Sequence, residues 1–257
     1  IQNKKIDDAD YSGTYGRVFP MTGLYIETPL KHITNNTKIT PKISLILNGS
    51  QPSSNKVSNE ESTNNAYSLL NTASLNRYTG TDKLDNSKRI NYGIEINKVI
   101  NFSLSQSYEL DTNSNYNQDV GLKDHMSDLL GNINYSGSKN SYNHDFRINV
   151  DQGLAKSQSI SVSNNSILGI TKVNYSMERV ENNSILETGS ERLTIDYNSK
   201  KIYKYSDLSL SSSFDLIEDN PTEYRIGYKY FDECFGVNLD FNRSFYSDRD
   251  LKPKDIL

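Results

Sequence analysis

Residues 90–110 alternate between apolar and polar side chains over two consecutive runs. Side chains of a β-strand point to opposite faces with a period of two, so each run has one apolar face and one wet face. The second run is about eleven residues long, close to the length of a tilted strand that crosses a bilayer. The apolar positions are Ile90, Tyr92, Ile94, Ile96, Ile100, Phe102, Leu104, Tyr108 and Leu110.

The phase of the two runs predicts that they pair as a hairpin. Opposed residues of an antiparallel pair share a face, so apolar residues must oppose apolar residues. A three-residue connection, 97–99, satisfies this condition and sets Ile94 against Phe102. Val99 is a poor residue for the left-handed conformation that such loops often need, so a five-residue loop in the same register is the alternative.

The composition of the chain is unusually polar for its length. Only 34% of its 257 residues are apolar, which by itself is typical of disorder. The sustained alternation and the 18 tyrosines argue against disorder. A closed β-barrel in a membrane explains both facts, because its outer face needs apolar groups while its lumen can be polar and wet. A soluble β-sandwich or adhesin-like β-module is the alternative.

The pattern predicts an all-β fold, an antiparallel up-and-down transmembrane β-barrel of which this chain supplies about 12 strands. No apolar run approaches the roughly 20 residues of a spanning helix. No Met opens the chain and no signal peptide is present, so we expect residues 1–257 to be an internal fragment of one barrel domain. The predicted strands centre on 24–28, 43–47, 90–96, 100–110, 129–135, 142–150, 160–162, 173–177, 193–197, 208–216, 224–230 and 235–241.

Connections between these strands alternate in predicted length. Outer-membrane barrels have short periplasmic turns and longer external loops, so parity assigns 48–89 to one long external loop region without spanning strands. The last hairpin needs a loop with an even number of residues. Asp232 and Glu233 are predicted to form this loop, with Phe231 opposite Cys234. Short turns are predicted near 97–99, 137–140, 164–166, 199–201 and 232–233, and longer loops at 111–128, 151–157, 180–190 and 217–222.

No pattern in the sequence predicts a catalytic, cofactor-binding or metal site. The three histidines, His32, His125 and His144, lack metal-binding spacing, and His144 has the register of a packed side chain. No nucleophile motif or phosphate-binding loop occurs, so no enzyme is predicted. The acidic pairs Asp82 with Asp85 and Asp248 with Asp250 are interpreted as solvated loop charges, not as acid–base or calcium pairs.

The net charge and the cysteine content exclude a basic nucleic-acid-binding surface and a disulfide within the chain. A net charge of −4 gives no basic footprint for nucleic acid. The chain has one cysteine, Cys234, so no disulfide can close within it.

Short motifs along the chain resemble those of a known protein family, which periodicity alone could not indicate. Residues 74–83, SLNRYTGTDK, followed by 89–94, RINYGI, resemble the passage "LxNRFSGxDR…R.NYG" of the LptD family, the lipopolysaccharide-assembly outer-membrane proteins. The order of the remaining motifs also fits, over most of the chain. They are 17–20 (RVFP), 40–43 (TPKI), 105–108 (SQSY), 121–122 (GL), 127–131 (SDLLG), 232–235 (DECF) and 247–253 (SDRDLKP).

The resemblance implies a Gram-negative outer-membrane barrel that inserts lipopolysaccharide into the outer leaflet. It also implies a plug lipoprotein in the lumen, and periplasmic bridge proteins that deliver the lipid through an N-terminal domain outside this chain. Cys234 matches one position of the family's two cysteine pairs, so a disulfide partner would lie outside this chain. A generic porin-like diffusion barrel remains the alternative function.

Overall fold

A computed structural model gives the fold of residues 2–3, 13–14, 18–49, 67–111, 125–182, 185–200 and 205–245. The strands are β1 (Gln2–Asn3), β2 (Gly13–Thr14), β3 (Met21–Glu27), β4 (Leu30–Lys31), β5 (Lys38–Asn48), β6 (Lys88–Asn97), β7 (Ile100–Glu109), β8 (Leu129–Ser136), β9 (Asn140–Asn149), β10 (Leu154–Asn165), β11 (Gly169–Asn182), β12 (Ile185–Ser199), β13 (Ser206–Asp215), β14 (Asn220–Phe231) and β15 (Gly236–Ser244).

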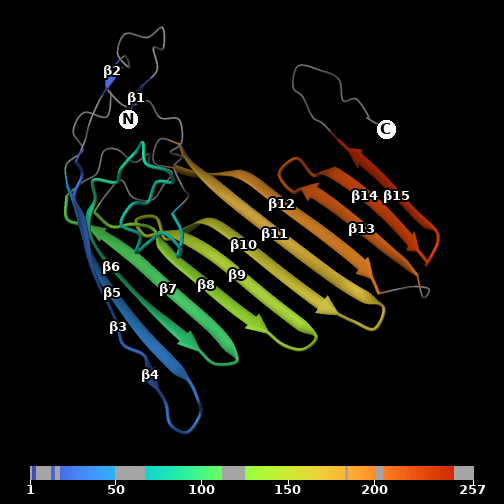
Figure 1. Cartoon of the computed structure of the whole chain (residues 1–257), viewed down its shortest axis with the longest axis horizontal. Coiled ribbons are helices and arrows are strands. Elements are labelled where there is room, and N and C mark those ends of the chain that lie inside the picture. Colours follow the sequence, from blue (N-terminus) through green and yellow to red (C-terminus); the bar gives the residue numbers. More distant parts are fainter. Residues whose placement is uncertain are drawn as a thin grey trace. The chain divides into compact units, whose positions relative to one another are not determined.

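Strands β3 to β15 form one 13-stranded sheet in which sequence neighbours pair. The order runs β15-β14-β13-β12-β11-β10-β9-β8-β7-β6-β5-β3, and β4 pairs with β5 (Figure 1). The predicted all-β, up-and-down antiparallel fold is therefore confirmed. Within the described residues, no helix is long and apolar enough to cross a membrane.

Contacts divide the chain into two compact units. The first comprises Ile1–Lys98, Phe102–Gly131 and Arg147–Leu154, and the second comprises Val99–Asn101, Asn132–Phe146 and Ala155–Leu257. In the second unit, cross-strand pairs join apolar side chains into rows across the sheet, because antiparallel register puts opposed residues on one face. One such row is Tyr197, Leu210, Ile226 and Phe241 on β12 to β15.

These apolar rows are exposed instead of buried. Leu210 is 39% exposed, Ile226 48% and Phe241 47%. Among the described residues only four apolar side chains are fully buried, against seventeen polar or charged ones. This distribution is the reverse of that in a water-soluble domain, where apolar side chains fill the interior.

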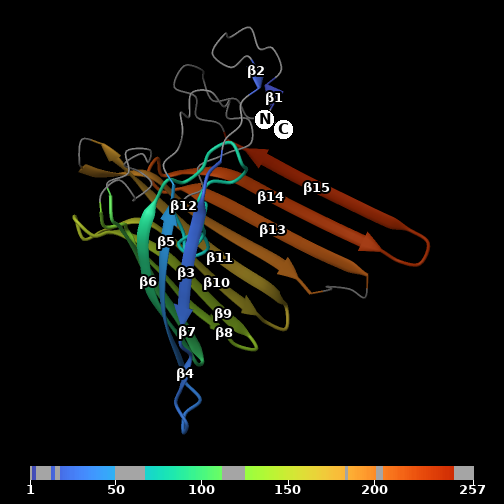
Figure 2. The ribbon, with the colours of Figure 1, turned by 60° about the vertical axis from the view of Figure 1, so that its left-hand side comes forward.

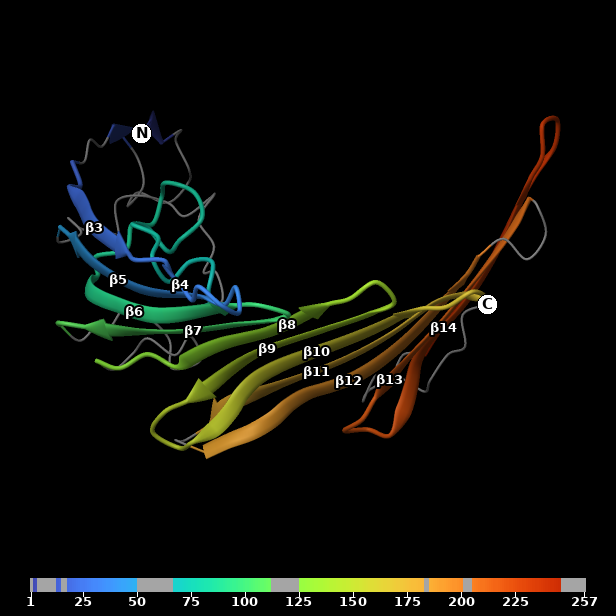
Figure 3. The same cartoon turned by 90° about the horizontal axis from the view of Figure 1, so that it is seen from below.

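In the first unit the opposite, polar face of the sheet is covered by residues 67–87, which we call the inlet. The inlet precedes β6 and contains no strand, and β5 pairs directly with β6. Figures 2 and 3 show the inlet lying against β5, β6 and β7.

The β6–β7 hairpin has the predicted parity but not the predicted register. Ile94 pairs with Leu104, and not with Phe102, so the three-residue connection was wrong. Ile96 pairs with Phe102, so five residues separate these two partners. The five-residue alternative kept the predicted register, which differs from the observed one by two residues, so its register was wrong as well. Among described residues only Asn36 and Asp219 are non-glycine residues with positive φ, so the longer loop avoids a left-handed Val99.

The β14–β15 hairpin deviates in the same way. Phe231 lies opposite Gly236, and not opposite Cys234, so the turn spans four residues instead of two. The Asp232 carboxylate explains the longer turn, because it accepts hydrogen bonds from the backbone N–H of Cys234 at 3.0 Å and of Phe235 at 2.8 Å. Such Asx turns compete with tighter hairpin geometries.

Three of the predicted longer loops are short turns. The ladder of β11 and β12 continues past the end of the apolar alternation, with Val180 opposite Glu187, so the predicted loop 180–190 is wrong. Loops 151–157 and 217–222 shorten in the same way, because β10 begins at Leu154 and β14 at Asn220. Backbone pairing does not require an apolar side chain, so polar residues at a strand end remain in the ladder.

Candidate functional site

An apolar contact anchors the beginning of the inlet. Tyr67 and Leu130 of β8 are each 3% exposed and pack with Leu69 and Tyr78. The Tyr67 hydroxyl lies 3.0 Å from the Ser127 hydroxyl, which satisfies its polar end. Burial raises the pKa of Tyr67 because the phenolate would lose its hydration.

Four buried charges anchor the rest of the inlet to the sheet. Arg77 Nε lies 2.9 Å from Asp85 Oδ2, and Arg77 also forms an ion pair with Glu109 at the end of β7. Arg89 at the start of β6 donates from Nη1 to the same Asp85 oxygen at 3.0 Å. None of these four side chains is more than 2% exposed.

Hydroxyl and amide groups complete this charge network, which we define as Arg77, Asp85, Ser87, Arg89 and Glu109. The Ser87 hydroxyl lies 2.6 and 2.7 Å from the two Glu109 carboxylate oxygens. The same hydroxyl accepts a hydrogen bond from Arg77 Nη2 at 3.0 Å. Asn48 Nδ2 donates to the carbonyls of Leu75 and Asp85 at 2.7 and 2.6 Å.

The network is electrically balanced, with two arginines facing two carboxylates. Taking an ion out of water costs several kcal/mol, and partners with good hydrogen-bond geometry must offset that cost. Two of the charges come from the inlet and two from the sheet. Detaching the inlet from the sheet would break the two ion pairs that join them, Arg77 with Glu109 and Asp85 with Arg89.

A row of polar side chains continues along the same face next to the charge network. Ser44, Asn91 and Ser107 are register partners on β5, β6 and β7. Asn91 Nδ2 donates to Ser44 Oγ at 2.8 Å, and Asn91 Oδ1 accepts from Ser107. The Ser127 hydroxyl accepts from the Ser107 backbone N–H at 2.8 Å and so extends the row.

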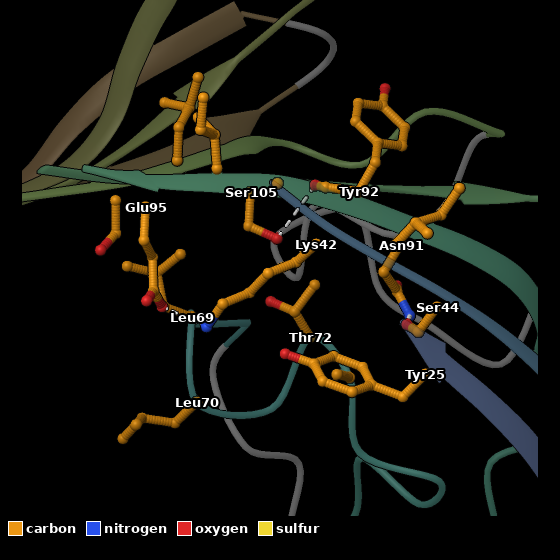
Figure 4. A pocket seen from close by; sticks show the side chains of 16 residues that line it. Tyr25, Lys42, Ser44, Leu69, Leu70, Thr72, Asn91, Tyr92, Glu95 and Ser105 are labelled. Carbon is orange, nitrogen blue, oxygen red and sulfur yellow. Dashed lines mark hydrogen bonds and ion pairs between the residues drawn. The ribbon is translucent and has the colours of Figure 1, made fainter. Parts of the chain in front are cut away.

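Between the inlet and this polar face lies a cavity of about 220 Å³. Leu69, Leu70 and Ala73 form its apolar side, whereas strands β3, β5, β6 and β7 supply polar groups. Figure 4 shows Lys42 extending across the cavity toward Glu95, with which it forms an ion pair. The cavity thus combines an apolar wall with a hydroxyl-rich and charged one.

The structure places the predicted disulfide candidate, Cys234, in the β14–β15 turn, where it is exposed. Its pairing with a cysteine outside this chain stays a prediction. His144 lies between Tyr142 and Phe146, with ring centroids 6.4 and 5.3 Å away, which is the packed environment predicted for it. Among described residues, no three potential ligands gather to hold a metal ion.

The interpretation of the acidic pairs as solvated charges was wrong for Asp85, which is 1% exposed in the charge network. Asp82 is half-buried, and Asp248 and Asp250 lie outside the described residues. The sequence reasoning also missed Arg77 and Glu109. The available signal was the family resemblance of segments 74–83 and 89–94, which contain Arg77 and Arg89.

Comparison with known protein families gives a decisive result. The family model described as LptD, LPS transport system D, matches residues 2–217. The chain belongs to the LptD family. A comparison with curated protein sequences found no match.

Two solved structures show a weaker similarity to this LptD-family chain. One is described as "Asymmetric conductivity of engineered proteins" and the other as a mutant of Rh. blastica porin. They share 10% and 11% identity, with a TM-score of 0.37 in both cases, over 88% of this chain and 86% of theirs. A TM-score this low assigns neither a fold nor a function to the chain.

Family membership gives the inlet a context. The segments that resemble the LptD motif, 74–83 and 89–94, include both arginines of the charge network. The motif therefore corresponds to a structural unit, the attachment of the inlet to β6 and β7.

Proposed function

We propose that this chain is the membrane-embedded part of an outer-membrane translocon that inserts lipopolysaccharide into the outer leaflet of a Gram-negative bacterium. The observation that carries the proposal is the match of residues 2–217 to the LPS transport family. The two-faced sheet supports it, because lipopolysaccharide has both a sugar part and acyl chains.

The polar face suits the sugar part of such a substrate. In the first unit it carries Lys42, Glu95 and the serine and asparagine row of β5 to β7. The exposed face of the same strands carries Ile43, Tyr92 and Leu104, an apolar surface that suits lipid. A molecule with both parts fits a wall that separates the two environments.

The inlet covers part of the polar face near one end of the strands. We infer that residues 48–89, to which it belongs, form an external loop region, since the two longest connections, 49–87 and 110–128, follow β5 and β7 and so share one end of the antiparallel strands. The fixed charge network lets the inlet act as a static constriction above the polar face.

Partners follow from the family and not from any contact observed. We propose a plug lipoprotein against the polar face and periplasmic bridge proteins that deliver lipopolysaccharide. We also propose that Cys234 forms a disulfide with a cysteine elsewhere in the protein.

Photocrosslinking in cells tests the substrate. A photoreactive residue replaces either Ser103, on the polar face of β7, or Leu104 on its apolar face. We expect lipopolysaccharide adducts from position 103 whenever transport runs. Absence of adducts from both positions, with normal barrel folding, would reject the substrate.

A depletion experiment separates the porin-like alternative. Loss of a translocon stops newly made lipopolysaccharide from reaching the cell surface, whereas loss of a porin slows the uptake of small solutes. Normal surface delivery after depletion, together with reduced solute uptake, would favour the porin.

A further inference from the structure

Two clusters of aromatic side chains lie at opposite ends of β13 to β15, which belong to the second unit. The first cluster, which we call the acidic girdle, is Tyr205, Tyr230, Asp232 and Phe235. Tyr230 lies 6.5 Å from Tyr205 and 6.3 Å from Phe235 between ring centroids. Its hydroxyl donates to Asp232 Oδ2 at 2.9 Å.

The second cluster, the cationic girdle, is Phe214, Tyr224, Arg243 and Phe245. Tyr224 lies 6.2 Å from Phe214 and 5.6 Å from Phe245 between ring centroids, both edge-to-face. The Arg243 guanidinium carbon lies 4.8 Å from the Phe245 ring centroid, within the range of a cation–π contact.

Register places the cationic girdle on the exposed apolar face. Arg243 is opposite Tyr224, and the next pair on that face is Phe241 with Ile226. Leu239 follows, 61% exposed and opposite Tyr228. Arg243 therefore lies on the same face as an otherwise apolar stripe, at the end of that stripe.

The spacing of the girdles matches the apolar layer of a membrane. Phe235 and Phe245 are separated by ten residues along β15, or about 33 Å at roughly 3.3 Å per residue. Barrel strands tilt by about 40°, which gives a layer about 25 Å thick. This is about the height of the apolar band that aromatic girdles border in outer-membrane barrels.

We propose that the two girdles mark the two boundaries of the bilayer's apolar layer, and that Arg243 binds the phosphate of a lipid headgroup at one of them. Arginine suits this role because its planar fork matches phosphate geometry and its stem and ring contact stay in the apolar layer. Asp232 makes the other girdle unsuited to phosphate. The inference rests on the membrane location contained in the proposed function, and not on its substrate.

Depth-dependent quenching tests the boundaries. This chain has no tryptophan, so Phe235→Trp, Phe241→Trp or Phe245→Trp in the full protein each adds one new signal over the parent. The proteins are reconstituted in phosphatidylcholine vesicles with bromine either near the headgroup or near the middle of the acyl chains. We expect position 241 to be quenched most by deep bromine, and positions 235 and 245 most by shallow bromine.

The outcomes distinguish the position of the boundary from the membrane location itself. Deep quenching at position 245 overturns the boundary while leaving the membrane location intact. No quenching at position 241 means that water or a protein partner covers this face, which overturns the membrane location as well.

Lipid binding tests Arg243. Native mass spectrometry measures phosphatidylglycerol retained by the full protein for Arg243→Ala and for the matched control Arg225→Ala, whose side chain pairs with Glu223 on the polar face. One arginine at a membrane surface changes binding by about fivefold. We expect this loss for Arg243→Ala alone. Equal retention by both variants, or equal loss, overturns the phosphate contact.

Discussion

Arg77 and Glu109 are 32 residues apart in the sequence, yet they form an ion pair from which solvent is excluded. One belongs to the inlet and the other to the end of β7. Their contact fixes the inlet to the sheet, because separating them would leave each charge buried without this partner.

Removing one member of this pair should be strongly destabilising. We expect Arg77→Met to lower the free energy of unfolding by about 3–5 kcal/mol, because Asp85 and Glu109 lose their shared cation while still buried. Urea-induced unfolding in lipid vesicles, followed by gel mobility, measures the change.

A matched exposed pair serves as the control. Lys88 and Asp111 form an ion pair at 2.9 Å with side chains 50% and 69% exposed. Lys88→Met should change the stability little, because solvent screens this pair. A similar loss in both variants would contradict a special role for burial.

A double substitution tests the balance of charge. Arg77→Met combined with Glu109→Gln removes one cation and one anion, so the network stays neutral. We expect the double variant to lose less unfolding free energy than the two single variants lose together, by about 1–3 kcal/mol. Simple additivity of the two single variants would show that the charges do not act as a unit.

Two neighbouring residues of β13 test which face meets lipid. Leu210→Arg places a charge in the exposed apolar row between Tyr197 and Ile226, and should cost about 2–4 kcal/mol near the membrane midplane. Ser209→Arg places the same charge on the polar face and should be tolerated. Folding yield into vesicles and unfolding midpoints measure both, and equal tolerance would refute the assigned faces.

The β14–β15 turn should lose stability in acid. Hydrogen bonds from the backbone N–H of Cys234, the Tyr230 hydroxyl and the backbone N–H of Phe235 lower the pKa of Asp232. A carboxyl whose folded pKa is depressed stabilises the fold above its ordinary pKa, and this contribution disappears as the pH falls through the folded value.

Hydrogen exchange of the turn amides against pH measures this loss. Asp232→Ala should expose the amides of Cys234 and Phe235 at neutral pH and remove the acid dependence. An unchanged acid dependence in the variant would assign it to another group.

Cys234 offers a chemical test of the proposed disulfide. We expect peptide mapping of the full protein under non-reducing conditions to find Cys234 joined to a second cysteine. Its exposure in the turn makes it accessible to a partner cysteine. Rapid alkylation of Cys234 without prior reduction would exclude the disulfide.

Alternation predicted the strands well because each strand has one apolar and one polar face. Ile226 and Phe241 could be assigned to one face from sequence alone, although their pairing with each other could not. Parity fixes the face but not the register, since a shift by two residues preserves it. Both hairpins therefore had the right face and the wrong partners.

The charge network was harder to predict than the sheet. Asp85 and Arg77 lie in a segment whose composition is typical of a solvated loop, and nothing local shows that they are buried. Only the correct register places Arg89 opposite Glu109 and so brings two of the charges together. The three-residue connection would have set Arg89 against Ser107, and the network would have had no visible anchor on β7.

Burial also decides how the inlet responds to the medium. At moderate ionic strength, salt screens the interaction between exposed charges with a screening length of about 10 Å, whereas it screens desolvated ion pairs much less. The ion pair of Lys88 with Asp111 should therefore weaken in concentrated salt, while the attachment through Arg77, Asp85, Arg89 and Glu109 persists. The inlet would therefore keep the same position on the sheet in dilute and in concentrated salt.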